Sequence, residues 1–98
     1  MLHIVNKSPF NNSALDECAR FAVGGGSVIL LIEDGVYAAK AGTSYEAKLK
    51  EIMARADVYA LEPDTKARGV DTLTDGVKLT DYNGFVDLVE KHKTHSWV

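Results

Sequence analysis

Four short segments of the chain have the hydrophobic pattern of buried β-strands. Each is rich in apolar or β-branched side chains and is bounded by a turn signal or by the end of a segment with helical character. The second is a continuous apolar run, which is typical of a strand that is covered on both faces. The four predicted strands are residues 2–6, 27–32, Asp57–Leu61 and 76–80.

Helical segments alternate with these strands. The first helix is expected to begin at Ser13, whose hydroxyl can accept first-turn amide hydrogen bonds while Asp16 completes a capping-box pattern. The glycines at 24–26 are expected to end it. The other helices are expected over residues 44–55, 63–68 and 83–92. This alternation predicts an α/β sandwich, with a mainly parallel four- to five-stranded sheet and helices on both faces.

Length and composition fit one small domain. The chain has 98 residues, of which 46% are hydrophobic and 26% are charged, so residues 1–98 are expected to form a single domain. A domain of this size buries only about 60 to 65% of the surface that its unfolded chain exposes, so a partner subunit would add stability. Association with other subunits is therefore expected from size alone.

Charge and apolar content exclude several classes of protein. The net charge is −3 and the basic residues do not gather in one segment, so direct binding to nucleic acid is not expected. The longest apolar run, residues 28–32, is far shorter than the roughly 20 residues of a membrane span. The single cysteine excludes an internal disulfide, and no secretory signal pattern is present. We expect a cytoplasmic location and no membrane.

Three motifs that suggest a cofactor or metal site have simpler interpretations. The triple glycine lies between a helix and a strand, which is the wrong end for a phosphate loop, so no nucleotide site is expected. His92 and His95 lack the further ligands that a zinc site needs. His3 alternates within the first strand and is interpreted as a pairing or interface residue rather than a base. We therefore expect no cofactor and no metal.

Polar residues follow the first two predicted strands, at the edge where open parallel sheets commonly bind ligands. Lys7 and Ser8 come after the first strand, and Asp34 and Gly35 come after the second. Two interpretations stand here. Asp34 and Gly35 form a turn that caps a following short helix, or the four residues line a small-ligand crevice like that of flavodoxin-like proteins.

Cys18 is the one side chain able to carry sulfur covalently. On a helical wheel it lies at the centre of the apolar stripe of the first helix, where a free cysteine often behaves as a small core residue. Asp16 and Glu17 oppose formation of a thiolate, and its own helix places no cation three or four positions away. We expect a weak nucleophile, unless Lys7 or a partner subunit supplies positive charge.

The chain resembles the DsrH/TusB family over nearly its whole length. Ala67, Arg68, Gly69 and the late Trp97 belong to the likeness. The main matching stretches are residues 2–10 (LHIVNKSPF), residues 33–39 (EDGVYAA) and residues 81–88 (DYNGFVDL).

The resemblance implies a DsrE/DsrF/DsrH-like fold and a place in a sulfur-relay complex. Such a complex is a heterohexamer with DsrE/TusD-like and DsrF/TusC-like subunits, and it passes persulfide sulfur to a downstream acceptor protein. The end point is 2-thiouridine at the tRNA wobble position or dissimilatory sulfur oxidation. DsrH-type members carry a cysteine in a context similar to that of Cys18, whereas some TusB-type members lack it.

Two roles remain open for Cys18 within such a complex. It is a candidate persulfide carrier, or the chain is a non-catalytic assembly subunit in which Cys18 is a buried core thiol.

Overall fold

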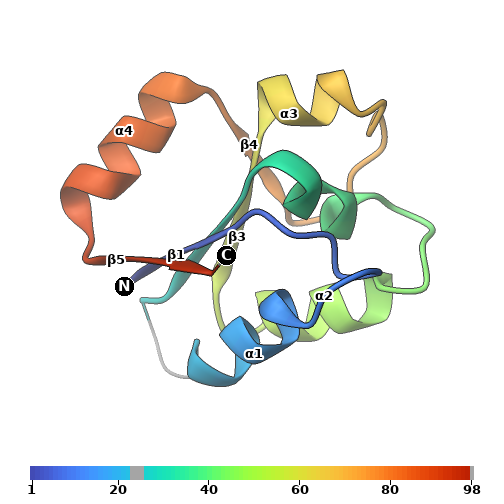
Figure 1. Ribbon diagram of the computed structural model, residues 1–98, viewed down its shortest axis with the longest axis horizontal. Coiled ribbons are helices and arrows are strands. Elements are labelled where there is room, and N and C mark those ends of the chain that lie inside the picture. The colour runs from blue at the N-terminus through green and yellow to red at the C-terminus, as the bar shows by residue number, and fades with distance from the viewer. Residues whose placement is uncertain (23–25, 98) are drawn as a thin grey trace.

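A five-stranded sheet organises the chain. The computed structural model describes residues 1–22 and 26–97. Every neighbouring pair of strands is parallel, and the spatial order is β4-β3-β2-β1-β5, so β1 lies between β2 and β5 (Figure 1). The strands are β1 (Leu2–Val5), β2 (Val28–Leu31), β3 (Asp57–Leu61), β4 (Lys78–Thr80) and β5 (Thr94–Trp97). The predicted α/β class and parallel sheet are thus confirmed.

The fifth strand is the element that the hydrophobic pattern did not locate. β5 consists of Thr94, His95, Ser96 and Trp97, of which only Trp97 is even half-buried. A strand at the edge of a sheet needs little apolar sequence, because it gains its main-chain hydrogen bonds from one neighbour and leaves its other side open. The other four strands fall where the apolar runs predicted them.

The helices agree with the prediction in number and place, but the start of the first differs in detail. α1 (Ala14–Phe21) follows Ser13, whose hydroxyl makes no capping bond to a backbone amide. Asn12 Oδ1 instead accepts the N–H of Ala14 at 2.7 Å, and the carboxylate of Asp16 accepts the hydroxyl of Tyr45. The predicted capping box is therefore wrong, because Asp16 is drawn into a tertiary contact.

The glycines that were expected to end α1 lie only partly within the described residues. Gly24 and Gly25 lie outside them, and Gly26 has a φ of +89°. The remaining predicted helices correspond to α2 (Glu46–Met53), α3 (Glu62–Ala67) and α4 (Tyr82–Lys91).

A 3₁₀ helix, η1 (Glu33–Ala39), follows β2 and packs against the end of β1. Gly35 approaches the backbone so closely that a Cβ atom at this position would overlap the carbonyl oxygen of Val5. Glycine is required there, because no other residue allows this approach. The contact fixes the chain at the carboxyl end of the two central strands.

Alternate residues of the central strands fill two separate cores. Val5 belongs to the core that α1, α2 and η1 cover, and His3 lies on the same side by alternation, whereas Leu2 and Ile4 belong to the core that α4 covers. Figure 1 shows α4 on the opposite side of the sheet from α1 and α2. The α1 side holds the larger core. On the other side the buried residues Leu2, Ile4, Val28 and Leu30 meet the half-buried side chains of Ile32, Tyr59, Phe85 and Leu88.

Two buried threonines offer a test of this packing. Thr65 Oγ1 donates to the carbonyl of Glu62 at 2.7 Å, whereas Thr74 Oγ1, equally buried, has no hydrogen-bond partner among the described residues. Valine has nearly the same shape as threonine. We predict that Thr74→Val leaves the free energy of unfolding unchanged or raises it by about 1 kcal/mol, because an unpaired buried hydroxyl is costly.

Thr65→Val is the matched control, and it should lower the free energy of unfolding by about 1 kcal/mol because it removes a made hydrogen bond. Urea unfolding of both variants measures the difference. A loss at Thr74 as large as that at Thr65 would show that the Thr74 hydroxyl is satisfied.

Candidate functional site

Cys18 lies on the inner face of α1 and is fully buried in the larger core. Burial raises the pKa of its thiol to about 12, because the apolar surroundings disfavour the thiolate. Only a minute fraction of such a thiol is ionised near neutral pH, and the thiolate is the nucleophilic form. In this conformation Cys18 is a packing residue.

Of the two causes expected from sequence, burial and the neighbouring acids, burial accounts for the raised pKa of Cys18. The pKa of Cys18 is raised by burial alone, and neither the acids beside it nor Lys7 contributes. Lys7 lies exposed after β1. The structure therefore brings no activating cation from the described residues to Cys18.

Polar contacts join α1 to α2 close to Cys18. The hydroxyl of Tyr45 donates to Asp16 Oδ1 at 2.7 Å, and Lys48 Nζ lies 3.9 Å from Asp16 Oδ2. Burial, together with the hydrogen bond to Asp16, raises the pKa of Tyr45, so the phenol stays protonated. Sequence reasoning missed Tyr45, since its link to Asp16 spans 29 positions of the chain.

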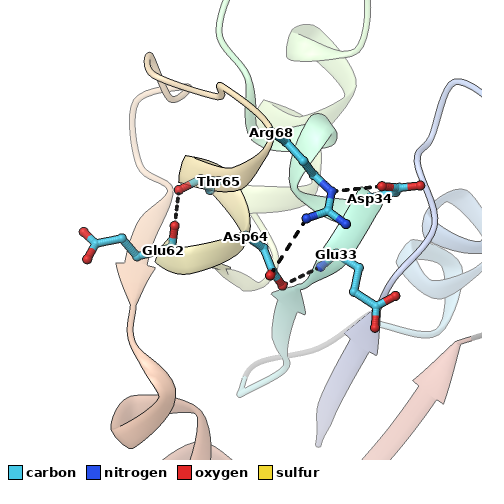
Figure 2. A network of polar contacts seen from close by, with 6 residues as sticks. All are labelled: Glu33, Asp34, Glu62, Asp64, Thr65 and Arg68. Carbon is cyan, nitrogen blue, oxygen red and sulfur yellow. Dashed lines mark hydrogen bonds and ion pairs between the residues drawn. The ribbon is translucent and has the colours of Figure 1, made fainter.

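At the carboxyl end of the sheet, Asp64 of α3 and Arg68, the residue that follows α3, contact the start of η1 (Figure 2). Asp64 Oδ2 accepts the backbone N–H of Glu33 at 2.7 Å, and Arg68 Nε donates to Asp34 Oδ1 at 2.9 Å. Glu33 has a φ of +49°, a conformation that L-residues adopt at a cost. We call Glu33, Asp34, Asp64 and Arg68 the strand-end clamp.

The strand-end clamp corrects one interpretation of the Asp34–Gly35 turn. Asp34 does not cap η1 with its own side chain; its carboxylate binds Arg68, and Asp64 accepts the first amide. Among the described residues, neither Lys7 nor Ser8 shares a hydrogen bond or ion pair with the clamp, and Ser8 Oγ accepts the N–H of Phe10 instead. Gly35 itself lies against Val5 and Asn6 at the end of β1, so the four residues share this edge of the sheet without a polar contact that joins them among the described residues.

His3 has a specific partner on β5. Trp97 Nε1 donates to His3 Nδ1 at 3.1 Å, and the two ring centroids lie 6.2 Å apart. His3 must be neutral to accept this hydrogen bond, since both nitrogens of a protonated histidine are donors. Burial, followed by the nearby N-terminal amine and His95, lowers the pKa of His3 below its ordinary 6.5. The predicted pairing role of His3 matches this contact.

Neither a metal-binding cluster nor a membrane-spanning helix is present among the described residues. Residues 1–22 and 26–97 contain no cluster of three or more histidine, cysteine, aspartate or glutamate side chains suited to a metal ion. Within the same part of the chain, every helix is too short or too polar to cross a membrane.

A hollow of about 290 Å³ lies between α1 and α2, with Asp16, Arg20 and Arg55 among its lining residues.

Comparison with known proteins identifies the family. The family model described as DsrH like protein matches residues 7–95. The chain belongs to the DsrH family. Protein TusB of Pectobacterium parmentieri is 39% identical to this DsrH-family chain, over 94% of each sequence. Protein TusB of Photorhabdus laumondii is 40% identical and that of Escherichia coli K12 is 37% identical, each with 94% of both sequences covered.

Solved structures share the fold of this DsrH-family chain at lower identity. The ychN protein from E. coli superposes with a TM-score of 0.79 at 21% sequence identity, covering 95% of this chain and 94% of that one. A protein of unknown function from Methanobacterium thermoautotrophicum, MTH1491, gives 0.72 at 17% identity, with 97% and 95% covered. These likenesses establish the fold.

The strand-end clamp predicts unequal roles for its two acids. The side chain of Asp64 is 19% exposed and accepts the backbone N–H of Glu33, which has no hydrogen-bond partner within η1. The side chain of Asp34 is 61% exposed. We predict that Asp64→Ala lowers the free energy of unfolding by about 1 to 2 kcal/mol. Asp34→Ala should cost less than about 1 kcal/mol, because water screens its ion pair.

Asp64→Asn is the matched control, since it keeps an oxygen that can accept the Glu33 amide. Chemical denaturation of the three variants should therefore rank Asp64→Ala as the least stable. Equal losses from Asp64→Ala and Asp34→Ala would contradict the assignment.

The buried His3 predicts a decline in stability at acid pH. The pKa of His3 is lower in the folded state than its ordinary 6.5, so the unfolded chain binds the proton more readily. The contribution of His3 to the free energy of unfolding is therefore fully present above pH 6.5 and is lost as the pH falls below it. Thermal unfolding between pH 5 and 8 measures this decline.

His3→Gln should flatten the pH dependence, because glutamine offers an oxygen to Trp97 and does not titrate. His92→Gln serves as the control, since His92 lies at the end of α4 and has no contact with Trp97 among those the structure describes. An unchanged slope in His3→Gln would show that other groups cause the decline.

Proposed function

We propose that this DsrH-family chain is a non-catalytic assembly subunit of a cytoplasmic sulfur-relay complex, in which Cys18 is a core residue. Family membership over residues 7–95 supports the place in a relay. The observation that carries the structural role is the full burial of the only thiol in the chain, with its pKa raised to about 12. In this conformation such a thiol is almost wholly protonated and is not accessible to a persulfide.

The proposed partners are the DsrE/TusD-like and DsrF/TusC-like subunits of a heterohexamer, and the active cysteine belongs to the DsrE/TusD-like partner. A downstream acceptor protein then takes the sulfur. Several of the similar proteins are named TusB. This naming favours 2-thiouridine formation at the tRNA wobble position over dissimilatory sulfur oxidation as the end point.

A second candidate is that Cys18 itself carries persulfide sulfur. The observation in its favour is that Cys18 is the one cysteine of the chain, set on a short helix at the side of the sheet rather than within it. For this role α1 must move away from the core when partner subunits bind, because Cys18 contacts no solvent in the isolated chain. The two candidates differ in what happens when the thiol is removed.

Cys18→Ala separates the two roles, because alanine fits the buried site and carries no sulfur. We predict that the variant assembles with its partners and sustains tRNA 2-thiouridine formation within about twofold of the unaltered chain, while the core loses about 1 to 2 kcal/mol. Liquid chromatography of tRNA nucleosides measures the modification, and size-exclusion chromatography of the co-expressed complex measures assembly.

Mass spectrometry of the unaltered complex after incubation with a persulfide donor provides the second readout. It should show added sulfur on the DsrE/TusD-like partner and none on Cys18. Loss of 2-thiouridine in an intact Cys18→Ala complex, together with added sulfur on Cys18, would establish the carrier role instead.

A further inference from the structure

The two edges of the sheet differ in how they are protected from other strands. The β4 edge is only three residues long, and its Lys78 pairs with Asp57 of the neighbouring strand at 3.8 Å between Nζ and Oδ1. Short length and lysine are common devices against pairing with another strand. β5 at the other edge has four residues and contains no lysine or proline. The β5 edge is therefore longer than the β4 edge and has no lysine within the strand itself, and Lys93 directly precedes it.

The backbone of β5 leaves two residues available for pairing. Leu2 lies opposite Thr94 in the parallel register, and its N–H donates to the carbonyl of Lys93 at 2.7 Å. In a parallel pair, alternate residues of a strand direct their backbone groups to the same neighbour. Since Lys93 bonds toward β1, Thr94 and Ser96 direct their N–H and C=O groups away from the sheet.

The side chains on the α1 side of this edge form an aromatic ledge. Trp97 lies with its ring centroid 4.7 Å from that of His95 and 5.5 Å from that of Phe21. Phe21 is 69% exposed although it is a large apolar side chain. Lys93 is also exposed, and it precedes His95 by two positions. Because side chains alternate along extended backbone, Lys93 lies on the same side of the sheet as His95 and Trp97. The ledge is thus continuous with the side of β5 that has no paired strand among the described residues.

We propose that β5 pairs in antiparallel fashion with β5 of a second copy of this chain, about a twofold axis through His95. In this register Thr94 faces Ser96 of the second copy and Ser96 faces Thr94, so the outward backbone groups form about four hydrogen bonds. The twofold axis also brings Lys93 opposite Trp97 of the second copy, where an ammonium group meets an indole ring. The edge is therefore complementary to itself in backbone, charge and aromatic content.

This pairing joins two sheets into one of ten strands, given the five in each copy. A contact built on two short strands is small, so the isolated chain should associate weakly and reversibly. The inference does not depend on the sulfur-relay role, because it concerns only how two copies of the chain meet.

Sedimentation velocity of the purified chain over a range of concentrations tests the proposal. A monomer–dimer equilibrium is expected in the unaltered chain. Ser96→Pro removes one outward N–H from each copy and should raise the dimer dissociation constant about tenfold or more. Ser96→Ala keeps the N–H and is the matched control, and its dissociation constant should stay within about twofold.

The fluorescence of Trp97, the only tryptophan, reports whether Ser96→Pro keeps the fold. If Ser96→Pro unfolds, Lys93→Glu tests the dimer in its place. This substitution puts a carboxylate against the indole of the second copy and should raise the dimer dissociation constant several-fold. Lys91→Glu on α4 is its control. A chain that stays monomeric up to about 1 mM, or a dimer unaffected by both Ser96→Pro and Lys93→Glu, overturns the proposal.

Discussion

The burial of β1 on every side is the constraint on which the rest of the structure depends. Its four residues are all buried, and its backbone lies between β2 and β5. Because side chains alternate along a strand, Leu2 and Ile4 require a cover on one face while His3 and Val5 require one on the other. The helices on both sides, the close approach of Gly35 and the pairing of β5 all help to bury this strand.

The same constraint decides the chemistry of Cys18. α1 covers the side of the sheet to which Val5 points, and its apolar stripe, with Cys18 at the centre, must face inward. Water is excluded from the thiol as a result, and its pKa rises. A persulfide carrier needs the opposite: an accessible sulfur near positive charge. In this conformation the fold of this DsrH-family chain keeps its thiol from solvent.

Polar groups act at the ends and edges of the sheet, where strands leave amides without partners. The strand-end clamp satisfies the first amide of η1 with a carboxylate from α3 and holds Glu33 in its unusual conformation. At the β5 edge, His3 accepts a hydrogen bond from Trp97, while the outer backbone of Thr94 and Ser96 has no strand beside it among the described residues. The clamp makes its contacts within the fold, whereas β5 lies at an edge of the sheet with a paired strand on one side only among the described residues.

The sequence by itself determined the α/β class, four of the strands and the buried stripe around Cys18, because these depend on the local periodicity of apolar residues. Only the tertiary structure decided which polar side chains contact one another. Asp16 meets Tyr45 and Asp34 meets Arg68 across 29 and 34 positions of the chain, which no local pattern reveals. β5 likewise forms only because the crossover through α4 delivers a polar segment to the free side of β1. Local sequence selects which residues are buried, whereas the fold selects which polar groups meet, because the latter depends on distances that exist only after the strands have paired.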